Sequence, residues 1–402
     1  MYYYFNKIYK YLLYNLKKVK IAILHEMLIK LGWAEKIVEN WCKIYTQADI
    51  FTLIYDEKKV WKIFPKHKIN NQVFNLKTQK IYKYTKKQRL CLSFMAYSIE
   101  QLDFSEYDIV LCSSSWFAHW AITKPETKFI VYYHSPARYM WDWTNEYKRD
   151  LWINRGIKKY LFSYIINNLF LKLRQWDYIA SKRADITLAN SNNTKQRIQK
   201  YYRKDSEILY PPVEIKRFWN NSVKLPLSTK IWDIPTYYYI IISALTEFKK
   251  IEIAINWFNK ISNQNLIIIW KWDYENSLKK ISSKNIIFLW DKYSDDLVFL
   301  VQNSLWLIFP WEEDFWIVPI EVMASWKPVF AYRWWWLLET ILEWTTWEFF
   351  DDKNGSDFIE KFLLFNKNNL IWKYSPELCK KQAENFSEDK FIKRIKELVQ
   401  NN

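Results

Sequence analysis

The sequence predicts an α/β protein with two doubly wound parallel-sheet domains. Short apolar runs rich in β-branched residues recur along the 402-residue chain, and each is followed by a segment with helical periodicity. Continuous apolar runs indicate strands that are buried on both faces, as in parallel sheets. The runs fall into two blocks on either side of Pro211 and Pro212. A double proline favours extended backbone and interrupts helix, so it marks a boundary between domains.

Each block contains a series of predicted strands that alternate with helices. The strands of the first block are Lys20–Leu24, Ile50–Tyr55, Asp108–Ser113, Lys128–His134 and Asp185–Asn190. The strands of the second block are Tyr238–Ser243, Asn265–Trp270, Asn285–Trp290, Leu305–Pro310 and Pro328–Tyr332. Such alternation is typical of parallel sheets with helices on both faces. The tail from Phe386 to Val399 predicts a further amphipathic helix.

We therefore expect two domains flanked by two smaller segments. Residues 1–19 form a basic, aromatic extension, and residues 20–212 and 213–384 form the two sheet domains. Residues 385–402 form a helix that crosses back to the N-terminal domain. The extension lacks the apolar core and cleavage site of a signal peptide, and no apolar run is long enough to span a bilayer. The sequence predicts a cytoplasmic protein and leaves peripheral contact with the inner face of the membrane open.

The composition is strongly basic, with 60 Lys and Arg against 43 Asp and Glu, a formal net charge of +17. This charge suits phosphorylated ligands, nucleic acids or anionic membranes, but the lysines are spread along the chain, which compositional drift explains equally well. No recognised nucleic-acid-binding pattern is present. The basic aromatic segments Tyr82–Leu90 and Lys148–Leu173 are candidates for contact with an anionic bilayer. The 4 cysteines show no metal spacing and predict reduced thiols.

Glycine and tryptophan counts are anomalous, at 3 and 25. Average usage of about 7% predicts roughly 28 glycines in a chain of this length. Trp334, Trp335 and Trp336 stand between a predicted strand and a helix, where positive φ and the approach of an anion favour glycine. We hypothesise that the gene uses a genetic code in which one stop codon encodes glycine, whereas the printed translation gives tryptophan at those codons. The alternative is a genuinely tryptophan-rich protein. The other suspect positions are Trp33, Trp270, Trp272, Trp311, Trp316, Trp326, Trp344 and Trp347.

With glycine at those positions, residues 309–329 resemble the pattern P-x-E-E-D-F-G-I-V-P-x-E-x-x-A-x-G-x-P-V of the retaining glycosyltransferases of family 4. The likeness covers nearly the whole chain from about residue 20, and the segment after the fourth strand is similar to a mannosyltransferase-like branch. Further matches are Gly32-Trp33-Ala34-Glu35 with G-G-A-E, Tyr133-His134-Ser135-Pro136, Trp141-Asp142, Asn190-Ser191 and Leu245 to Lys250 with L-x-x-x-K. The resemblance implies the GT-B fold, in which two Rossmann-like domains face each other across a cleft.

The resemblance also implies a function. It implies transfer of a hexosyl group, with mannosyl as one candidate, from a nucleotide sugar such as GDP-mannose or a UDP-hexose. The acceptor would be a glycan or lipid-linked molecule in cell-envelope polysaccharide synthesis. The C-terminal domain would bind the nucleotide sugar and the N-terminal domain the acceptor. The sequence contains no Asp-x-Asp, so we expect a metal-independent mechanism without a cofactor.

Site residues follow from the same resemblance. Glu313 would face the donor sugar at the reacting centre, and Glu321 would accept hydrogen bonds from the ribose hydroxyls. Lys249 would bind the diphosphate. His134 would point at the donor sugar or the transition state. The other expected nucleotide-sugar contacts are Gly32, Trp33, Arg138, Phe315, Trp316, Ile317, Trp334, Trp335 and Trp336. Ala244 occupies a position where many members carry a second cation, and Arg333 is a candidate substitute.

Two other functions remain open from the sequence. Strand–turn–helix units also suit dinucleotides, so one alternative is a nicotinamide-dependent oxidoreductase. However, with glycine at Trp270 and Trp272, residues 270–275 read only G-x-G-x-x-E, and they lie in the middle of the chain. The other alternative is a catalytically degenerate, membrane-associated binding protein. Turnover of a nucleotide sugar separates the transferase from both.

Overall fold

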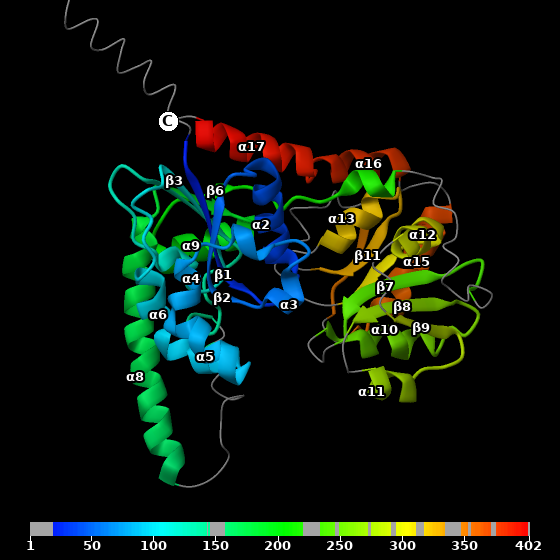
Figure 1. Cartoon of the computed structure of the whole chain (residues 1–402). Helices are drawn as coiled ribbons and strands as arrows, with labels where there is room; N and C mark the ends of the chain where they lie inside the picture. The colour runs from blue at the N-terminus through cyan, green and yellow to red at the C-terminus, as the bar shows by residue number, and fades with distance from the viewer. Residues whose placement is uncertain are drawn as a thin grey trace, which may run out of the picture. The chain divides into compact units, whose positions relative to one another are not determined.

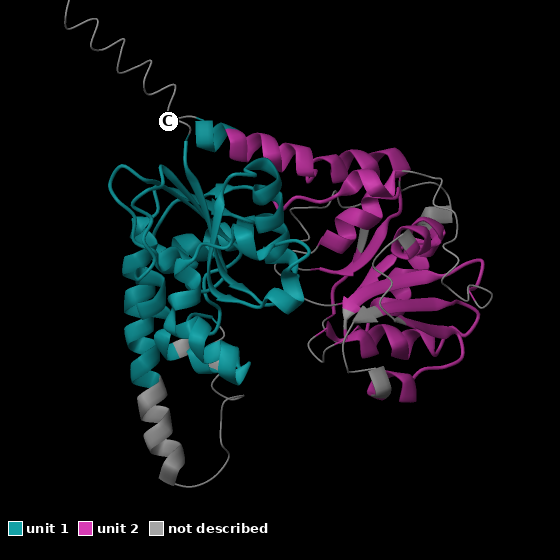
Figure 2. Cartoon of the chain, viewed as in Figure 1, with its two compact units in different colours: residues 1–209, 397–402 teal, residues 210–396 magenta. Residues whose placement is uncertain are grey.

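A computed structural model describes residues 19–142, 144, 157–219, 234–245, 249–271, 275–290, 295–310, 317–333, 347–352, 355–370 and 375–400. The chain divides into two compact units, residues 1–209 with 397–402 and residues 210–396 (Figure 2). Each unit contains one six-stranded sheet, and every strand pair is parallel. The predicted fold class, with a Rossmann-like sheet in each half, is confirmed.

The sheet of the first unit has the order β2-β1-β3-β4-β5-β6 (Figure 1). Its strands are β1 Ile21–Leu28, β2 Asp49–Tyr55, β3 Ile109–Ser114, β4 Lys128–Tyr133, β5 Ile186–Ala189 and β6 Glu207–Ile208. Its helices are α2 Trp33–Ile44, α3 Glu57–Val60, α4 Gln72–Asn75, α5 Lys77–Thr85, α6 Leu92–Glu100, α8 Ile157–Ala180 and α9 Asn192–Tyr202. The chain leaves β1 for the edge at β2 and returns to β3 on the other side, so the order reverses between β1 and β3.

A fully buried carboxylate, Asp177, joins α8 to α9 and to the segments that carry Trp120 and Trp141. It accepts hydrogen bonds from Trp120 Nε1 at 2.8 Å, Trp141 Nε1 at 2.7 Å and Tyr202 OH at 2.8 Å. A buried charge is stable only when it is paired or fully hydrogen-bonded. Trp141 also stacks on Tyr201, with ring centroids 4.9 Å apart. These contacts use both the indole N–H and the ring of Trp141.

The sheet of the second unit has the order β12-β11-β10-β7-β8-β9. Its strands are β7 Tyr239–Ala244, β8 Leu266–Lys271, β9 Ile286–Trp290, β10 Leu307–Phe309, β11 Val329–Tyr332 and β12 Trp347–Phe350. Its helices are α10 Ile251–Phe258, α11 Glu275–Lys280, α12 Asp295–Asn303, α13 Ile317–Ala324, α15 Phe358–Leu370 and α16 Pro376–Glu384. The order reverses between β7 and β10, as in the Rossmann fold.

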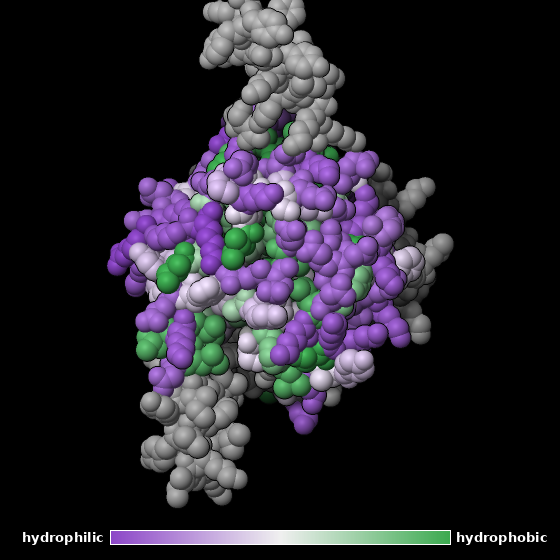
Figure 3. All heavy atoms as spheres, turned by 60° about the vertical axis from the view of Figure 1, so that its left-hand side comes forward, coloured by the Kyte–Doolittle hydropathy of each residue, from purple (hydrophilic) through white to green (hydrophobic). Residues whose placement is uncertain are grey.

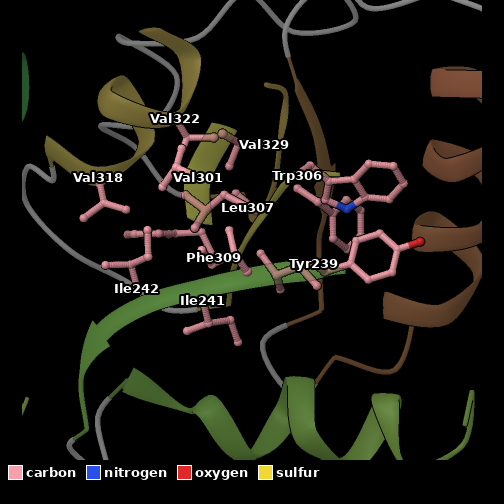
Figure 4. Packing of buried hydrophobic residues seen from close by; sticks show 14 of the residues in the cluster. Tyr239, Ile241, Ile242, Val301, Trp306, Leu307, Phe309, Val318, Val322 and Val329 are labelled. Atoms are coloured by element: carbon pink, nitrogen blue, oxygen red, sulfur yellow. The ribbon is translucent and has the colours of Figure 1, made fainter. Parts of the chain in front are cut away.

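The core of this unit lies along β7 and β10. Ile240, Ile241 and Ile242 on β7 are at most 1% exposed. Figure 4 shows Trp306 beside Tyr239, and their ring centroids are 4.7 Å apart. Aliphatic side chains from neighbouring elements fill the space around them, which explains the continuous apolar runs in the sequence.

Helix α13 ends in a Schellman motif. The backbone N–H of Trp326 donates to the carbonyl of Met323 at 2.9 Å, and that of Lys327 donates to Val322 at 3.2 Å. Trp326 has φ of 61°, the left-handed conformation that this motif requires and that glycine usually supplies. A bulky residue at this position is strained.

The predicted tail helix is confirmed as α17, Glu388–Gln400. Within the described residues, no helix is both long enough and apolar enough to cross a membrane. Residues 1–18, most of the predicted N-terminal extension, lie outside the described residues.

Candidate functional site

In the first unit, polar side chains gather where the strand order reverses. His25 on β1 lies opposite Ser113 on β3 in the parallel register. His25 Nδ1 is 3.0 Å from Ser113 Oγ, and Ser113 Oγ is 2.8 Å from Nε2 of His134, directly after β4. Three neighbouring strands therefore place two imidazoles on one hydroxyl. The carboxyl side of such a switch point is where doubly wound sheets bind ligands.

His25 is 3% exposed and lies between two carboxylates. Its Nε2 is 3.8 Å from Glu35 Oε1, and its Nδ1 is 3.7 Å from Glu26 Oε2. Burial opposes the charged form, but Glu35 and Glu26 outweigh it, so the pKa of His25 lies above its ordinary value. Burial likewise acts against the charge on Glu35, and His25 outweighs it, so the pKa of Glu35 is lowered. The two carboxylates beside His25 therefore favour its protonated form.

Gly32 allows this ion pair to form. It is the N-cap of α2, and a Cβ at this position would lie 2.9 Å from Glu35 Oε2. A side chain at position 32 would therefore require the Glu35 carboxylate to shift. Trp33 begins the helix and is 45% exposed. The backbone N–H groups of this first turn are the kind that bind anions.

Glu26 anchors the loop after β3. Its Oε1 accepts backbone hydrogen bonds from Ser115 at 2.6 Å, Trp116 at 2.7 Å and Ala118 at 3.4 Å. The side chain of Glu26 is buried, so these donors compensate for the loss of water. The loop next to Ser113 is thereby held in place.

His134 is partly buried. Its backbone N–H donates to Ser114 O at 2.9 Å, and its carbonyl accepts from Thr194 Oγ1 at 3.3 Å, at the start of α9. Burial and, to a smaller extent, the neighbouring charge of His25 lower the pKa of His134 to about 4. The ring is therefore neutral at physiological pH.

Arg138 follows His134 in the turn after β4 and is partly buried. Burial, with the neighbouring Arg197, lowers the pKa of Arg138 to about 10, so it remains a cation at neutral pH. Arg197 on α9 donates to Asp142 Oδ1 at 2.8 Å. The first unit thus places one predicted cation, Arg138, within the same loop as His134.

In the second unit, the predicted residues flank the reversal between β7 and β10. Lys249 lies between β7 and α10 and is 2% exposed. An ordinary surface lysine would be solvated, and lysines are almost never fully buried without a counter-charge. Ala244, at the end of β7, leaves no second cation there. Arg333, the candidate substitute, pairs instead with Asp351.

Glu321 is the one residue of α13 that is not buried. All other residues of this helix, from Ile317 to Ala324, are buried. Ile317, the first residue of the helix, is 5% exposed. The helix therefore holds a single carboxylate in a fixed place beyond the end of β10.

The remaining predicted contacts lie outside the described residues: Glu313, Phe315, Trp316, Trp334, Trp335 and Trp336. In the part of the chain that is described, no group of three or more His, Cys, Asp or Glu is placed to hold a metal ion.

Two protein-family models match the chain. "Glycosyltransferase Family 4" matches residues 64–217, and "Glycosyl transferases group 1" matches residues 231–389. The chain is a GT-B glycosyltransferase. No curated relative matches the sequence. The glycosyltransferase matches decide against the oxidoreductase alternative.

Solved structures of glycosyltransferases share this fold. HepE from Anabaena in complex with UDP is 13% identical, with a TM-score of 0.69 over 96% of this chain and 100% of that chain. Sucrose-phosphate synthase from Thermosynechococcus elongatus is 12% identical, with a TM-score of 0.68 over 95% and 98%. WaaG, a glycosyltransferase involved in lipopolysaccharide biosynthesis, is 12% identical, with a TM-score of 0.59 over 95% and 100%.

Sequence reasoning gave no role to three residues of the first site: Ser113, Glu35 and Glu26. Ser113 ends an apolar run that predicts only a buried strand. Glu35 is visible only as part of a short glycine-containing motif, and Glu26 lies just after the predicted strand Lys20–Leu24. The structure extends this strand to Leu28 and buries Glu26 within it, which the sequence did not indicate.

Proposed function

We propose that the chain transfers a hexosyl group, with mannosyl as one candidate, from a nucleoside diphosphate sugar to a glycan or lipid-linked acceptor. The observation that carries this proposal is the position of the predicted residues. His134 adjoins the strand reversal of the first sheet, and Lys249 and Glu321 flank that of the second. UDP is bound by HepE, which shares the fold, and this supports a nucleotide-sugar donor.

The second unit binds the nucleotide sugar in this proposal, and the first binds the acceptor. Glu321 accepts hydrogen bonds from the ribose, because it is the one carboxylate that α13 leaves unburied. Lys249 neutralises charge that develops on the departing diphosphate. His134 and Glu313 contact the donor sugar. Gly32, Trp33 and Arg138 contribute anion-binding groups from the first unit.

We further propose retention of configuration by front-side attack. The bond between the anomeric carbon and the diphosphate oxygen breaks while the acceptor oxygen bonds to the same face of that carbon. The acceptor proton passes to the leaving diphosphate oxygen. The step needs no metal in this proposal, because Lys249 and backbone N–H groups supply the positive charge. Involvement of WaaG in lipopolysaccharide biosynthesis supports a role in envelope polysaccharide synthesis.

A donor screen tests this proposal. Protein made with glycine at the suspect tryptophan positions is mixed with UDP-glucose, UDP-galactose, UDP-N-acetylglucosamine or GDP-mannose, and release of the nucleotide is measured. We expect hydrolysis or transfer with one donor. Absence of both with every nucleotide sugar would refute the function.

The tryptophan hypothesis gains support from the end of α13. Trp326 occupies the left-handed position of a Schellman motif, with φ of 61°, where glycine is the usual residue. We propose that it stands for glycine in the natural protein, together with the other suspect positions. Peptide mass spectrometry of the natural protein decides this, and a gene with UGG at these codons would contradict it.

Trp326→Gly is expected to raise the free energy of unfolding of the printed chain by about 1 kcal/mol, because a non-glycine residue in the left-handed region costs roughly 1–2 kcal/mol. Denaturant unfolding measures the change. The matched control is Trp61→Gly, at a residue that is 55% exposed with φ of −56°. There we expect a loss of roughly 0.5–1 kcal/mol. Equal losses at both positions would show that Trp326 is not strained.

We also propose that the first unit contacts an anionic membrane. Tyr84, near the end of α5, is 83% exposed, and Lys83 and Lys87 beside it are exposed. On α8, Leu169 and Leu171 are 42% and 49% exposed. Figure 3 shows one face of the molecule, on which small apolar areas interrupt a largely hydrophilic surface. Basic and aromatic side chains together favour the interface of an anionic bilayer.

Vesicle sedimentation tests this contact. We expect binding to vesicles with phosphatidylserine and much weaker binding to pure phosphatidylcholine. Reversing two charges, Lys83→Glu with Lys87→Glu, should weaken binding at least tenfold, since each lysine contributes about 1 kcal/mol. Lys260→Glu and Lys279→Glu, in the second unit, serve as a control with the same change of net charge. Equal weakening by both pairs would contradict a specific surface.

A further inference from the structure

The two ring nitrogens of His134 have different surroundings. Nε2 lies 2.8 Å from Ser113 Oγ. For Nδ1, the described residues provide no hydrogen-bond partner. A neutral imidazole carries its proton on one nitrogen only, and the partner of the other nitrogen decides which. The direction of the hydrogen bond between Ser113 and His134 therefore determines which ring nitrogen of His134 carries the proton.

The Ser113 hydroxyl has one proton to donate and imidazoles on two sides. Its oxygen is 3.0 Å from His25 Nδ1 and 2.8 Å from His134 Nε2. A hydroxyl can donate to only one of them and must accept from the other. One ring therefore donates to Ser113, and the other accepts from it.

The surroundings of His25 settle the direction. Its Nε2 faces the Glu35 carboxylate at 3.8 Å. Its Nδ1 faces the backbone carbonyl of Ser113 at 3.3 Å and the Glu26 carboxylate at 3.7 Å. Both nitrogens thus have acceptors next to them, which favours a proton on each. A protonated Nδ1 donates to Ser113, whose own proton must then be donated to His134 Nε2.

We propose that Glu35, His25 and Ser113 form a positioning relay that holds the proton of His134 on Nδ1, so that a neutral ring presents an N–H donor to the sugar donor. The inference rests on the proposed function, because the contact of His134 with the sugar is part of it. The opposite tautomer would present a lone pair, which can accept a hydrogen bond from a hydroxyl but cannot donate one, and which repels phosphate oxygens. The directions of the two pKa shifts, upward for His25 and downward for His134, agree with one charged and one neutral ring.

Nitrogen-15 NMR tests the relay without any substrate. The chain has 4 histidines, so histidine-selective labelling of the full-length protein gives few signals, and His67→Gln and His119→Gln help to assign them. Long-range proton–nitrogen spectra distinguish the protonated nitrogen from the bare one. We expect the proton of His134 on Nδ1 and protons on both nitrogens of His25. A proton on Nε2 of His134 in the wild type would overturn the relay.

Ser113→Ala tests the link between the rings. We expect a mixture of His134 tautomers, a fall in kcat of about fivefold to tenfold, as for one lost hydrogen bond, and a KM within twofold of the wild type. Ser113→Thr, which keeps the hydroxyl, should restore the tautomer. The matched control is Ser98→Ala, because Ser98 is also fully buried in the first unit and its hydroxyl has no partner among the described residues.

Glu35→Gln provides a second test if Ser113→Ala does not fold. Without the carboxylate, His25 is expected to lose one proton, and the proton of His134 should shift toward Nε2. An unchanged His134 tautomer in either folded variant would overturn the relay. The spectra need no nucleotide sugar, so they decide this inference separately from the donor screen, whose failure would instead refute the proposed function.

Discussion

Replacing Lys249 with alanine is expected to lower kcat by about 100-fold to 1,000-fold, the usual cost of removing one group that stabilises charge in a transition state. Negative charge develops on the leaving diphosphate as its bond to the sugar breaks. Lys249 lies at the strand reversal of the second sheet and is 2% exposed. An ammonium group in such a water-poor place acts more strongly on a nearby anion than one at the surface. Rates of nucleotide release with saturating donor measure the effect.

Two further variants separate loss of charge from loss of packing. Lys249→Met keeps most of the buried stem and should be as inactive as the alanine variant. Lys249→Arg keeps the charge and should recover part of the rate. Lys260→Ala, at an exposed lysine that lies over the Trp257 ring at 4.1 Å, should leave kcat unchanged. Full activity in folded Lys249→Met would show that Lys249 is only structural.

The strands could be predicted from the sequence because both faces of each sheet are covered. Ile109–Cys112 and Tyr239–Ile242 are unbroken apolar runs within β3 and β7, since parallel strands under two helical layers present no side to water. The two strands that were not predicted lack this signal. Glu207–Ile208 is only 2 residues long, and Trp347–Phe350 follows a segment that reads as a turn.

The site could be predicted only in part, because some of its residues are far apart in the sequence and come together only in the folded sheet. His134 and Lys249 follow predicted strands, which is where ligands bind in α/β proteins. Ser113 has no such signal, because its role depends on β1 lying next to β3 with His25 opposite Ser113. That pairing is a property of the sheet order, which a single sequence does not specify. The buried position of Lys249 is another consequence of packing that the local sequence does not show.

His134→Ala is expected to lower kcat by about 100-fold, because the variant removes the N–H group that we propose donates a hydrogen bond to the sugar. The matched control is His67→Ala, since His67 is exposed in a short helix between β2 and α4 and should not affect the rate. Nucleotide release with a saturating donor again provides the measurement. Activity of the alanine variant equal to that of the control would exclude His134 from the reaction.

The pH dependence of the wild type gives a second readout for the same residue. Burial lowers the pKa of His134 to about 4, whereas an unfolded histidine titrates near pH 6.5. Between these values the unfolded chain binds more protons at this position than the folded chain. Stability from His134 is therefore complete above about pH 6.5 and declines as the pH falls toward 4. His134→Ala should make the melting temperature less sensitive to acid in this window.

The rate should follow the same titration. Because the neutral ring is the active form, we expect protonation of His134 to reduce kcat/KM only as the pH approaches about 4. A histidine with an ordinary pKa would instead produce an acid limb near pH 6.5. Glu26, Glu35 and His25 are the charged groups that act on the His134 ring. Glu35→Gln changes the charge on His25, so it is a suitable comparison for effects that reach His134 through His25. An acid limb near pH 6.5 that disappears in His134→Ala would contradict the buried, neutral state of this histidine.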